Sequence, residues 1–86
     1  MNWDFQLSST ARRAFRSMPA KDRERINRAL NEMKSNPLSG DIVPLKGEYD
    51  GQYRRRVGSW RIIFRLRPAD RVVLIADIRR RGSTTY

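Results

Sequence analysis

The fold is decided in the second half of the chain, where residues 53–66 read YRRRVGSWRIIFRL. In segment 60–66, four large apolar side chains alternate with Arg61, Ile63 and Arg65, which is typical of a strand that buries one face. Segment 53–57 begins on Tyr53 and ends on Val57, two side chains of the same parity. The Gly-Ser pair between the two segments favours a tight turn. The stretch therefore predicts two adjacent antiparallel strands.

Further elements flank this pair on both sides. Residues 72–78 form another apolar strand-like segment, and residues 42–45 indicate one short strand. Residues 3–7 alternate as a half-buried strand does, and apolar side chains spaced by three and four predict helices near 11–18 and 20–35. The expected fold class is α+β. It comprises an N-terminal strand, an α-helical hairpin and then an antiparallel sheet of three to four strands, all in a single domain that spans the 86 residues.

Strand alternation also predicts which side chains share a face of the sheet. The side chains expected to face the helices are Tyr53, Val57, Trp60, Ile62, Phe64, Leu66, Val72, Leu74, Ala76 and Ile78. Those expected on the opposite face are Ile63, Val73, Ile75 and Asp77, together with the arginines Arg54, Arg56, Arg61 and Arg65, with Arg79 at the edge. Lys46 precedes the first of these strands, and Arg80 and Arg81 lead into the C-terminal tail.

The composition restricts both the partners and the chemistry. Nineteen Lys and Arg residues against nine Asp and Glu residues give a net charge of +10, so RNA, DNA or an acidic protein is the expected kind of partner. The chain has no cysteine and no histidine, so neither a thiolate metal site nor a histidine base is expected. We expect no cofactor and no metal. The sequence has no membrane-helix or signal-peptide pattern, which predicts a cytoplasmic location.

Several arginines on one sheet face repel one another, and a bound anion relieves that repulsion. Guanidinium groups suit phosphate because they donate two parallel hydrogen bonds to its oxygens. Tyrosines near these positions add side chains that can stack on a base. The alternative is a basic face that is simply solvated, and a terminal tyrosine such as Tyr86 is more often disordered than functional.

Four sequence features together resemble the RelE/ParE toxin superfamily over essentially the whole chain. They are Asn36-Pro37 after the second helix, Leu45-Lys46-Gly47, the run from Tyr53 to Phe64, and a final pair of arginines followed by a tyrosine. The RelE branch implies a metal-independent endoribonuclease that enters the ribosomal A site and cleaves mRNA. The implied partners are mRNA, the ribosome and a cognate acidic antitoxin.

The resemblance also implies site residues. The catalytic candidates are Arg56, Arg61, Arg80 and Tyr86, with Arg81 as the alternative to Arg80. The candidates for binding RNA phosphates are Lys46, Arg54, Arg56, Arg65, Arg79 and Arg81. Tyr86 is the hypothesised general base, because neighbouring arginines favour a phenolate.

The chain departs from parts of the superfamily, and two other functions stay open. Some branches have a carboxylate where this chain has Val43, and others have a histidine before the last tyrosine. ParE-like members inhibit DNA gyrase by binding it and cleave no RNA. The third alternative is a non-catalytic basic binding module.

Overall fold

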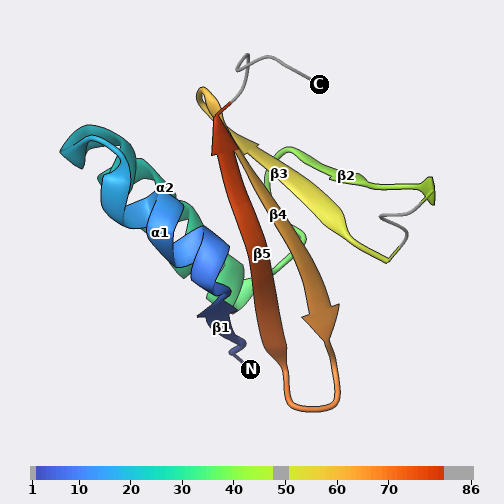
Figure 1. Ribbon diagram of the computed structural model, residues 1–86. Coiled ribbons are helices and arrows are strands. Elements are labelled where there is room, and N and C mark those ends of the chain that lie inside the picture. The colour runs from blue at the N-terminus through green and yellow to red at the C-terminus, as the bar shows by residue number, and fades with distance from the viewer. Residues whose placement is uncertain (1, 48–50, 81–86) are drawn as a thin grey trace.

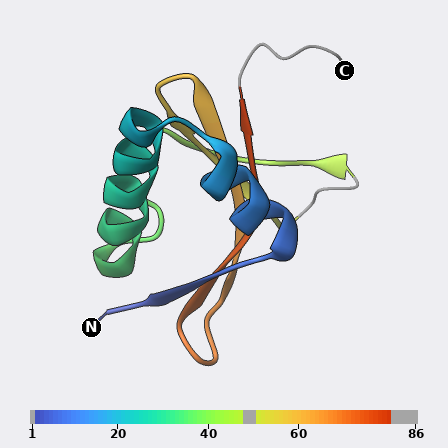
Figure 2. The same ribbon diagram turned by 60° about the vertical axis from the view of Figure 1, so that its left-hand side comes forward.

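Two helices pack against one face of a five-stranded sheet and leave the other face uncovered by any described element (Figure 1, Figure 2). The computed structural model describes residues 2–47 and 51–80. Its elements are β1 (Asp4–Leu7), α1 (Ser9–Ser17), α2 (Ala20–Ser35), β2 (Ile42–Pro44), β3 (Tyr53–Val57), β4 (Trp60–Arg67) and β5 (Val72–Arg80). The expected α+β fold class is confirmed.

The helices form where apolar stripes and end signals coincide. The Ser8 hydroxyl accepts a hydrogen bond from the Ala11 amide at 3.0 Å, which satisfies one open donor at the start of α1. Pro19 directly precedes α2, where its fixed φ suits a helix start. The buried residues of α2 are Ile26, Ala29, Leu30 and Met33. They pack on the sheet and form the main core with its buried strand residues.

The N-terminal strand β1 completes the sheet at the edge beside β5, and the strand order is β1-β5-β4-β3-β2. It runs parallel to β5, whereas the other neighbouring strands are antiparallel. Two parallel strands need a long crossover between them. The chain between β1 and β5 provides it, and the helices on this path cover one sheet face.

The side chains expected to face the helices do so in β4, but the expectation fails in the middle of β5. Val73 and Ile75 lie in the core, whereas Leu74 is only half-buried and Ala76 is exposed. The expected inward placement of Leu74 and Ala76 is therefore wrong, and so is the expected outward placement of Val73 and Ile75. Val72, also expected inward, is buried but lies outside the main core cluster.

A β-bulge explains this difference. Phe64 pairs with Ile75 but Ile63 pairs with Asp77, so Ala76 is an extra residue on β5. The Ser8 hydroxyl donates a 2.6 Å hydrogen bond to the Ala76 carbonyl, which ties the start of α1 to the bulge. One extra residue reverses the alternation. Before the bulge, the odd-numbered residues Val73 and Ile75 face the helices, whereas after it the even-numbered Ile78 does.

Candidate nucleic-acid interface

A row of three arginines crosses the uncovered face of the sheet. Arg56 on β3 is paired with Arg61 on β4, and Arg61 is paired with Arg79 on β5. Side chains of directly paired residues lie on the same face, with Cβ atoms roughly 4.5–5.5 Å apart. Like charges at this spacing destabilise a sheet, so the row is poorly explained as a device for folding.

A second row lies two residues further along the strands, on the same face of the sheet. It runs from Arg54 on β3 through Ile63 on β4 to Asp77 on β5. Arg65 follows on β4, where it is paired with Leu74. We call the five basic side chains of this face the open-face arginine cluster: Arg54, Arg56, Arg61, Arg65 and Arg79.

Two carboxylates partly neutralise the cluster. The Nε atom of Arg56 lies 2.9 Å from Oδ2 of Asp41, and Nε of Arg79 lies 2.7 Å from Oδ2 of Asp77. Within residues 2–47 and 51–80, no carboxylate forms an ion pair with Arg54 or Arg65. Among the described residues of this face, five arginines stand against two aspartates, an excess of positive charge that suits an anion.

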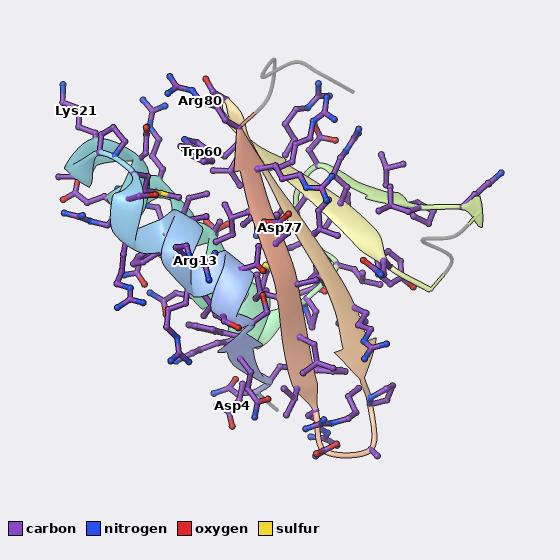
Figure 3. All side chains as sticks on the ribbon, viewed as in Figure 1. Asp4, Arg13, Lys21, Trp60, Asp77 and Arg80 are labelled. Carbon is purple, nitrogen blue, oxygen red and sulfur yellow. The ribbon has the colours of Figure 1, made fainter. Side chains whose placement is uncertain are left out.

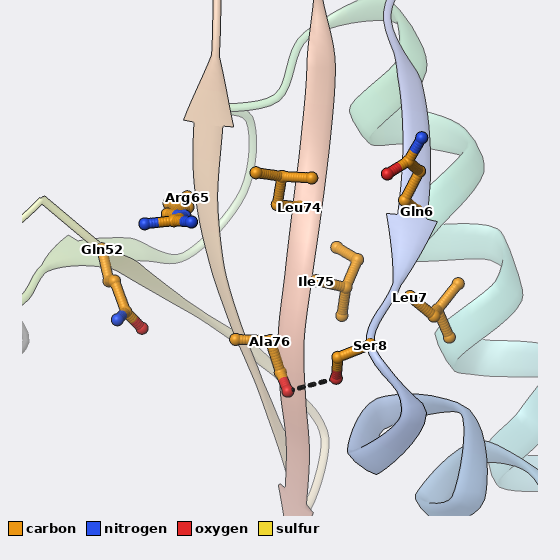
Figure 4. Close-up of a pocket in the computed structure, with 8 residues that line it drawn as sticks. All are labelled: Gln6, Leu7, Ser8, Gln52, Arg65, Leu74, Ile75 and Ala76. Carbon is orange, nitrogen blue, oxygen red and sulfur yellow. Dashed lines mark hydrogen bonds between the residues drawn. The ribbon is translucent and has the colours of Figure 1, made fainter.

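A hollow of about 470 Å³ adjoins the Arg65 end of the cluster (Figure 4). Its lining includes the polar side chains of Gln6, Gln52 and Arg65, together with Leu74. The Ser8–Ala76 hydrogen bond closes one side, so the bulge helps to shape it. The hollow combines hydrogen-bonding groups with an apolar surface.

Arg55 lies on the opposite face and has a different environment. Only 7% of it is exposed, and it is the buried charged residue of the described chain. Its Nη1 atom donates to the Ala29 carbonyl at 3.1 Å, and its Nη2 atom pairs with Glu32 on α2. Arg55 therefore links β3 to α2 and is separated from the open-face arginine cluster by the sheet.

The remaining predicted site residues do not join the cluster in the described part of the chain. Arg80 lies with its guanidinium carbon 5.8 Å from the Trp60 ring centroid, and Figure 3 shows both residues on the helix side of β5. The superfamily resemblance made Arg80 a catalytic candidate, but its pairing with Trp60 puts it on the opposite face of the sheet from the cluster, and its catalytic role stays a prediction. Lys46 is exposed in the segment after β2. Arg81 and Tyr86 lie outside the described residues.

Asp41 and Asp77 are the residues of this face that sequence reasoning missed as site members. Alternation had placed Asp77 outward, but nothing in the pattern showed that it would pair with Arg79. The signal for Asp41 was weaker, because it lies before β2 in a segment without clear periodicity.

In residues 2–47 and 51–80, no group of three or more His, Cys, Asp or Glu side chains could hold a metal ion. Neither of the described helices is long and apolar enough to span a membrane.

Comparisons with known proteins agree with this architecture. Residues 6–84 match the family model for the ParE toxin of the type II toxin–antitoxin system parDE. No curated protein matches the chain.

Solved toxin structures share the fold at low sequence identity. The RelBE2 toxin–antitoxin complex from Mycobacterium tuberculosis has a chain with a TM-score of 0.85 and 22% identity, covering 94% of this chain and 100% of that one. The archaeal RelE–RelB complex from Pyrococcus horikoshii gives 0.83 and 24%, covering 98% and 100%. The YoeB/ParE toxin from Agrobacterium tumefaciens gives 0.79 and 20%, covering 90% and 96%. Because the family model matches most of the sequence, the chain belongs to the ParE toxin family of type II toxin–antitoxin systems, within the RelE/ParE superfamily.

Proposed function

We propose that this toxin is a metal-independent endoribonuclease that cleaves mRNA, with the open-face arginine cluster binding the scissile phosphate. The observation that carries this proposal is the row Arg56–Arg61–Arg79 across three adjacent strands. Like charges in such a row repel one another, and guanidinium groups can donate parallel hydrogen bonds to the oxygens of a phosphate. The chain lacks histidine and cysteine, so arginine, lysine, tyrosine and carboxylate side chains are the groups available for the reaction.

The reaction that fits this site is attack of the ribose 2′-hydroxyl on its own phosphate. Negative charge builds on the phosphate oxygens as the new bond forms, and fixed guanidinium donors stabilise it. Arg61 is central because it has an arginine paired on each side. Each well-aimed donor contributes about 10²–10³ in rate.

The other predicted residues keep supporting roles in the proposal. Tyr86 is the predicted general base, and Arg80 or Arg81 the predicted C-terminal catalytic arginine, all as the superfamily resemblance implies. Lys46, exposed beyond β2, is proposed to contact a flanking phosphate. The hollow beside Arg65 is proposed to take a sugar or base next to the cleaved bond.

The ribosome and an antitoxin are the proposed partners. A site with weak bases benefits when the mRNA is held in a reactive geometry, which the ribosomal A site would supply. That target implies a cytoplasmic location. Solved relatives of the same fold are described as complexes of a toxin with its antitoxin. The basic surface of this chain favours an acidic antitoxin segment.

The first test compares two arginine variants in cleavage of a translated mRNA, read by primer extension. Arg61→Ala should slow cleavage by about 10²–10³-fold, because it removes a phosphate donor. Arg13→Ala, on the exposed side of α1, is the matched control and should cleave as the parent does. Equal cleavage by the parent and Arg61→Ala would contradict the proposed site.

Inhibition of DNA gyrase is the second candidate function. The observation that favours it is the family match, since the matching model describes a ParE toxin. A supercoiling assay with purified gyrase, run beside the primer-extension assay, separates the two functions. Inhibition of supercoiling without mRNA cleavage would replace the ribonuclease proposal. RNA binding without either activity would indicate a non-catalytic binding module.

A further inference from the structure

We infer that Asp77, in place of the Tyr86 that the superfamily resemblance implies, is the catalytic residue of the open face that accepts the proton of the attacking 2′-hydroxyl. The inference rests on the proposed ribonuclease function and names the group that takes this proton. Asp77 is the one acidic residue within the sequences of β3, β4 and β5. Those strands also carry all five arginines of the open-face arginine cluster.

The position of Asp77 follows from the β-bulge. Asp77 is paired with Ile63, and the neighbouring pair on the same face is Arg61 with Arg79. Without the extra residue at Ala76, the alternation that buries Val73 and Ile75 would turn Asp77 toward the helices. Figure 3 shows Asp77 on the side of β5 away from the helices. The bulge therefore places one carboxylate beside the arginine row.

The carboxylate is held in a fixed orientation. Its Oδ1 atom accepts a 2.8 Å hydrogen bond from the Ile78 amide, and Oδ2 accepts a 2.7 Å bond from Nε of Arg79. Each carboxylate oxygen can accept more than one hydrogen bond, so both keep capacity for a substrate hydroxyl. The Asp77 side chain is 20% exposed, which leaves it reachable from the open face.

Asp41, the other carboxylate near the cluster, is less suited to this role. Its side chain is 49% exposed, and it lies directly before β2, the strand at the far edge of the sheet. Asp77 is more shielded from water and has charged side chains around it on three strands: Arg79 on β5, Arg61 and Arg65 on β4, and Arg54 on β3. A base acts on a substrate proton only within hydrogen-bond reach, and Asp77 adjoins the proposed phosphate position.

The step balances without a metal or cofactor. The 2′-O–H bond breaks and its proton moves to an Asp77 carboxylate oxygen, while the 2′-oxygen forms a bond to phosphorus. The bond from phosphorus to the 5′-oxygen breaks, and that oxygen takes a proton from water. Asp77 then returns its proton to the hydroxide that remains. The products are a 2′,3′-cyclic phosphate and a 5′-hydroxyl end.

The test uses the full chain with translating ribosomes and separates catalysis from binding. Asp77→Asn keeps an oxygen for the Ile78 amide but cannot serve as the base, so the cleavage rate at saturation should fall by about 10²–10⁴-fold. Affinity for the programmed ribosome should not weaken. Asp70→Asn, the matched control, breaks an exposed pair with Arg67 in the β4–β5 turn and should cleave as the parent does. Thermal melts of both variants check the fold.

A second pair of variants separates catalysis from positioning. If Asp77 only orients Arg79, then Arg79→Gln should slow cleavage as much as Asp77→Asn, and the double variant no further. That result overturns the inference. An independent base predicts a further loss in the double variant, since the two residues act on different atoms.

Two outcomes distinguish this inference from the proposed function. Cleavage by Asp77→Asn at the parent rate overturns the role of Asp77 and leaves the ribonuclease proposal intact. Failure of the parent itself to cleave overturns the ribonuclease proposal, and the inference falls with it.

Discussion

Arg54, Arg55 and Arg56 are consecutive in the sequence and have opposite environments in the fold. Arg54 and Arg56 project from β3 onto the uncovered face, where they join the open-face arginine cluster. Arg55 projects to the other face and is buried against α2. Since alternate residues of a strand face opposite sides, one short basic run contributes both to a surface and to the core. Arginine identity alone therefore does not assign a functional role.

The two environments differ in how each charge is compensated. Arg55 has fixed partners on α2, namely the Ala29 carbonyl and the Glu32 carboxylate. Burying a charge costs several kcal/mol unless such partners satisfy it. Arg56 instead pairs with a half-exposed aspartate, and the pair contributes about 0.2–1 kcal/mol at most. The open-face pairs can therefore exchange a carboxylate for a phosphate at little cost in stability.

The largest effect on stability is expected at Arg55. Arg55→Ala should lower the free energy of unfolding by roughly 2–3 kcal/mol, because it removes a buried side chain and its bonds to α2. The loss is at the lower end for a buried ion pair, since Glu32 is 53% exposed and water can solvate it. Arg54→Ala, the adjacent control, should change stability by less than about 0.5 kcal/mol. Urea unfolding measures both values.

If the two faces of β3 have separate roles, the ranking of the two variants by loss of cleavage rate should be the reverse of their ranking by loss of stability. Per folded molecule, Arg55→Ala should cleave as the parent does, whereas Arg54→Ala should be slower. A similar loss of stability in both variants would show that the face of β3 does not decide the role of its arginines.

A smaller effect is expected at Gly40, which packs over the Arg55 guanidinium. Its φ is +90°, and a Cβ atom there would lie 2.9 Å from Nε of Arg55. Gly40→Ala should cost roughly 1–2 kcal/mol, from backbone strain and displacement of Arg55. In a thermodynamic cycle with Arg55→Ala, the double variant should lose less than the two single losses combined, because the contact is already gone. Simple additivity would mean that the strain lies in the backbone alone.

The smallest effect is expected on the open face itself. Asp41→Asn removes the carboxylate paired with Arg56 and should change stability by less than about 0.5 kcal/mol. The same variant should bind a short single-stranded RNA about two- to fivefold more tightly, because Arg56 no longer has to give up the Asp41 carboxylate before it binds an RNA phosphate. Filter binding at fixed salt measures this change. Weaker binding would indicate that Asp41 orients Arg56 for RNA.

Much of the candidate interface could be predicted from the alternation of residues along β3 and β4. That alternation placed Arg54, Arg56, Arg61 and Arg65 on one face, and the register agrees. It failed in β5, because a bulge depends on contacts with neighbouring elements, here Ser8 before α1 and the register with β4. Arg80 was a candidate by the superfamily resemblance alone, and its pairing with Trp60 places it on the helix side of the sheet.

By itself, the sequence determined the α+β class, the helix pair, the strand alternation and the strong positive charge, because these depend on local periodicity and composition. Three features became visible in the folded chain alone: β1 joins β5 in parallel, Ala76 is extruded as a bulge, and Asp77 lies beside Arg79. Those features depend on residues far apart in the sequence. Their contacts form only when the sheet assembles, so no local pattern encodes them.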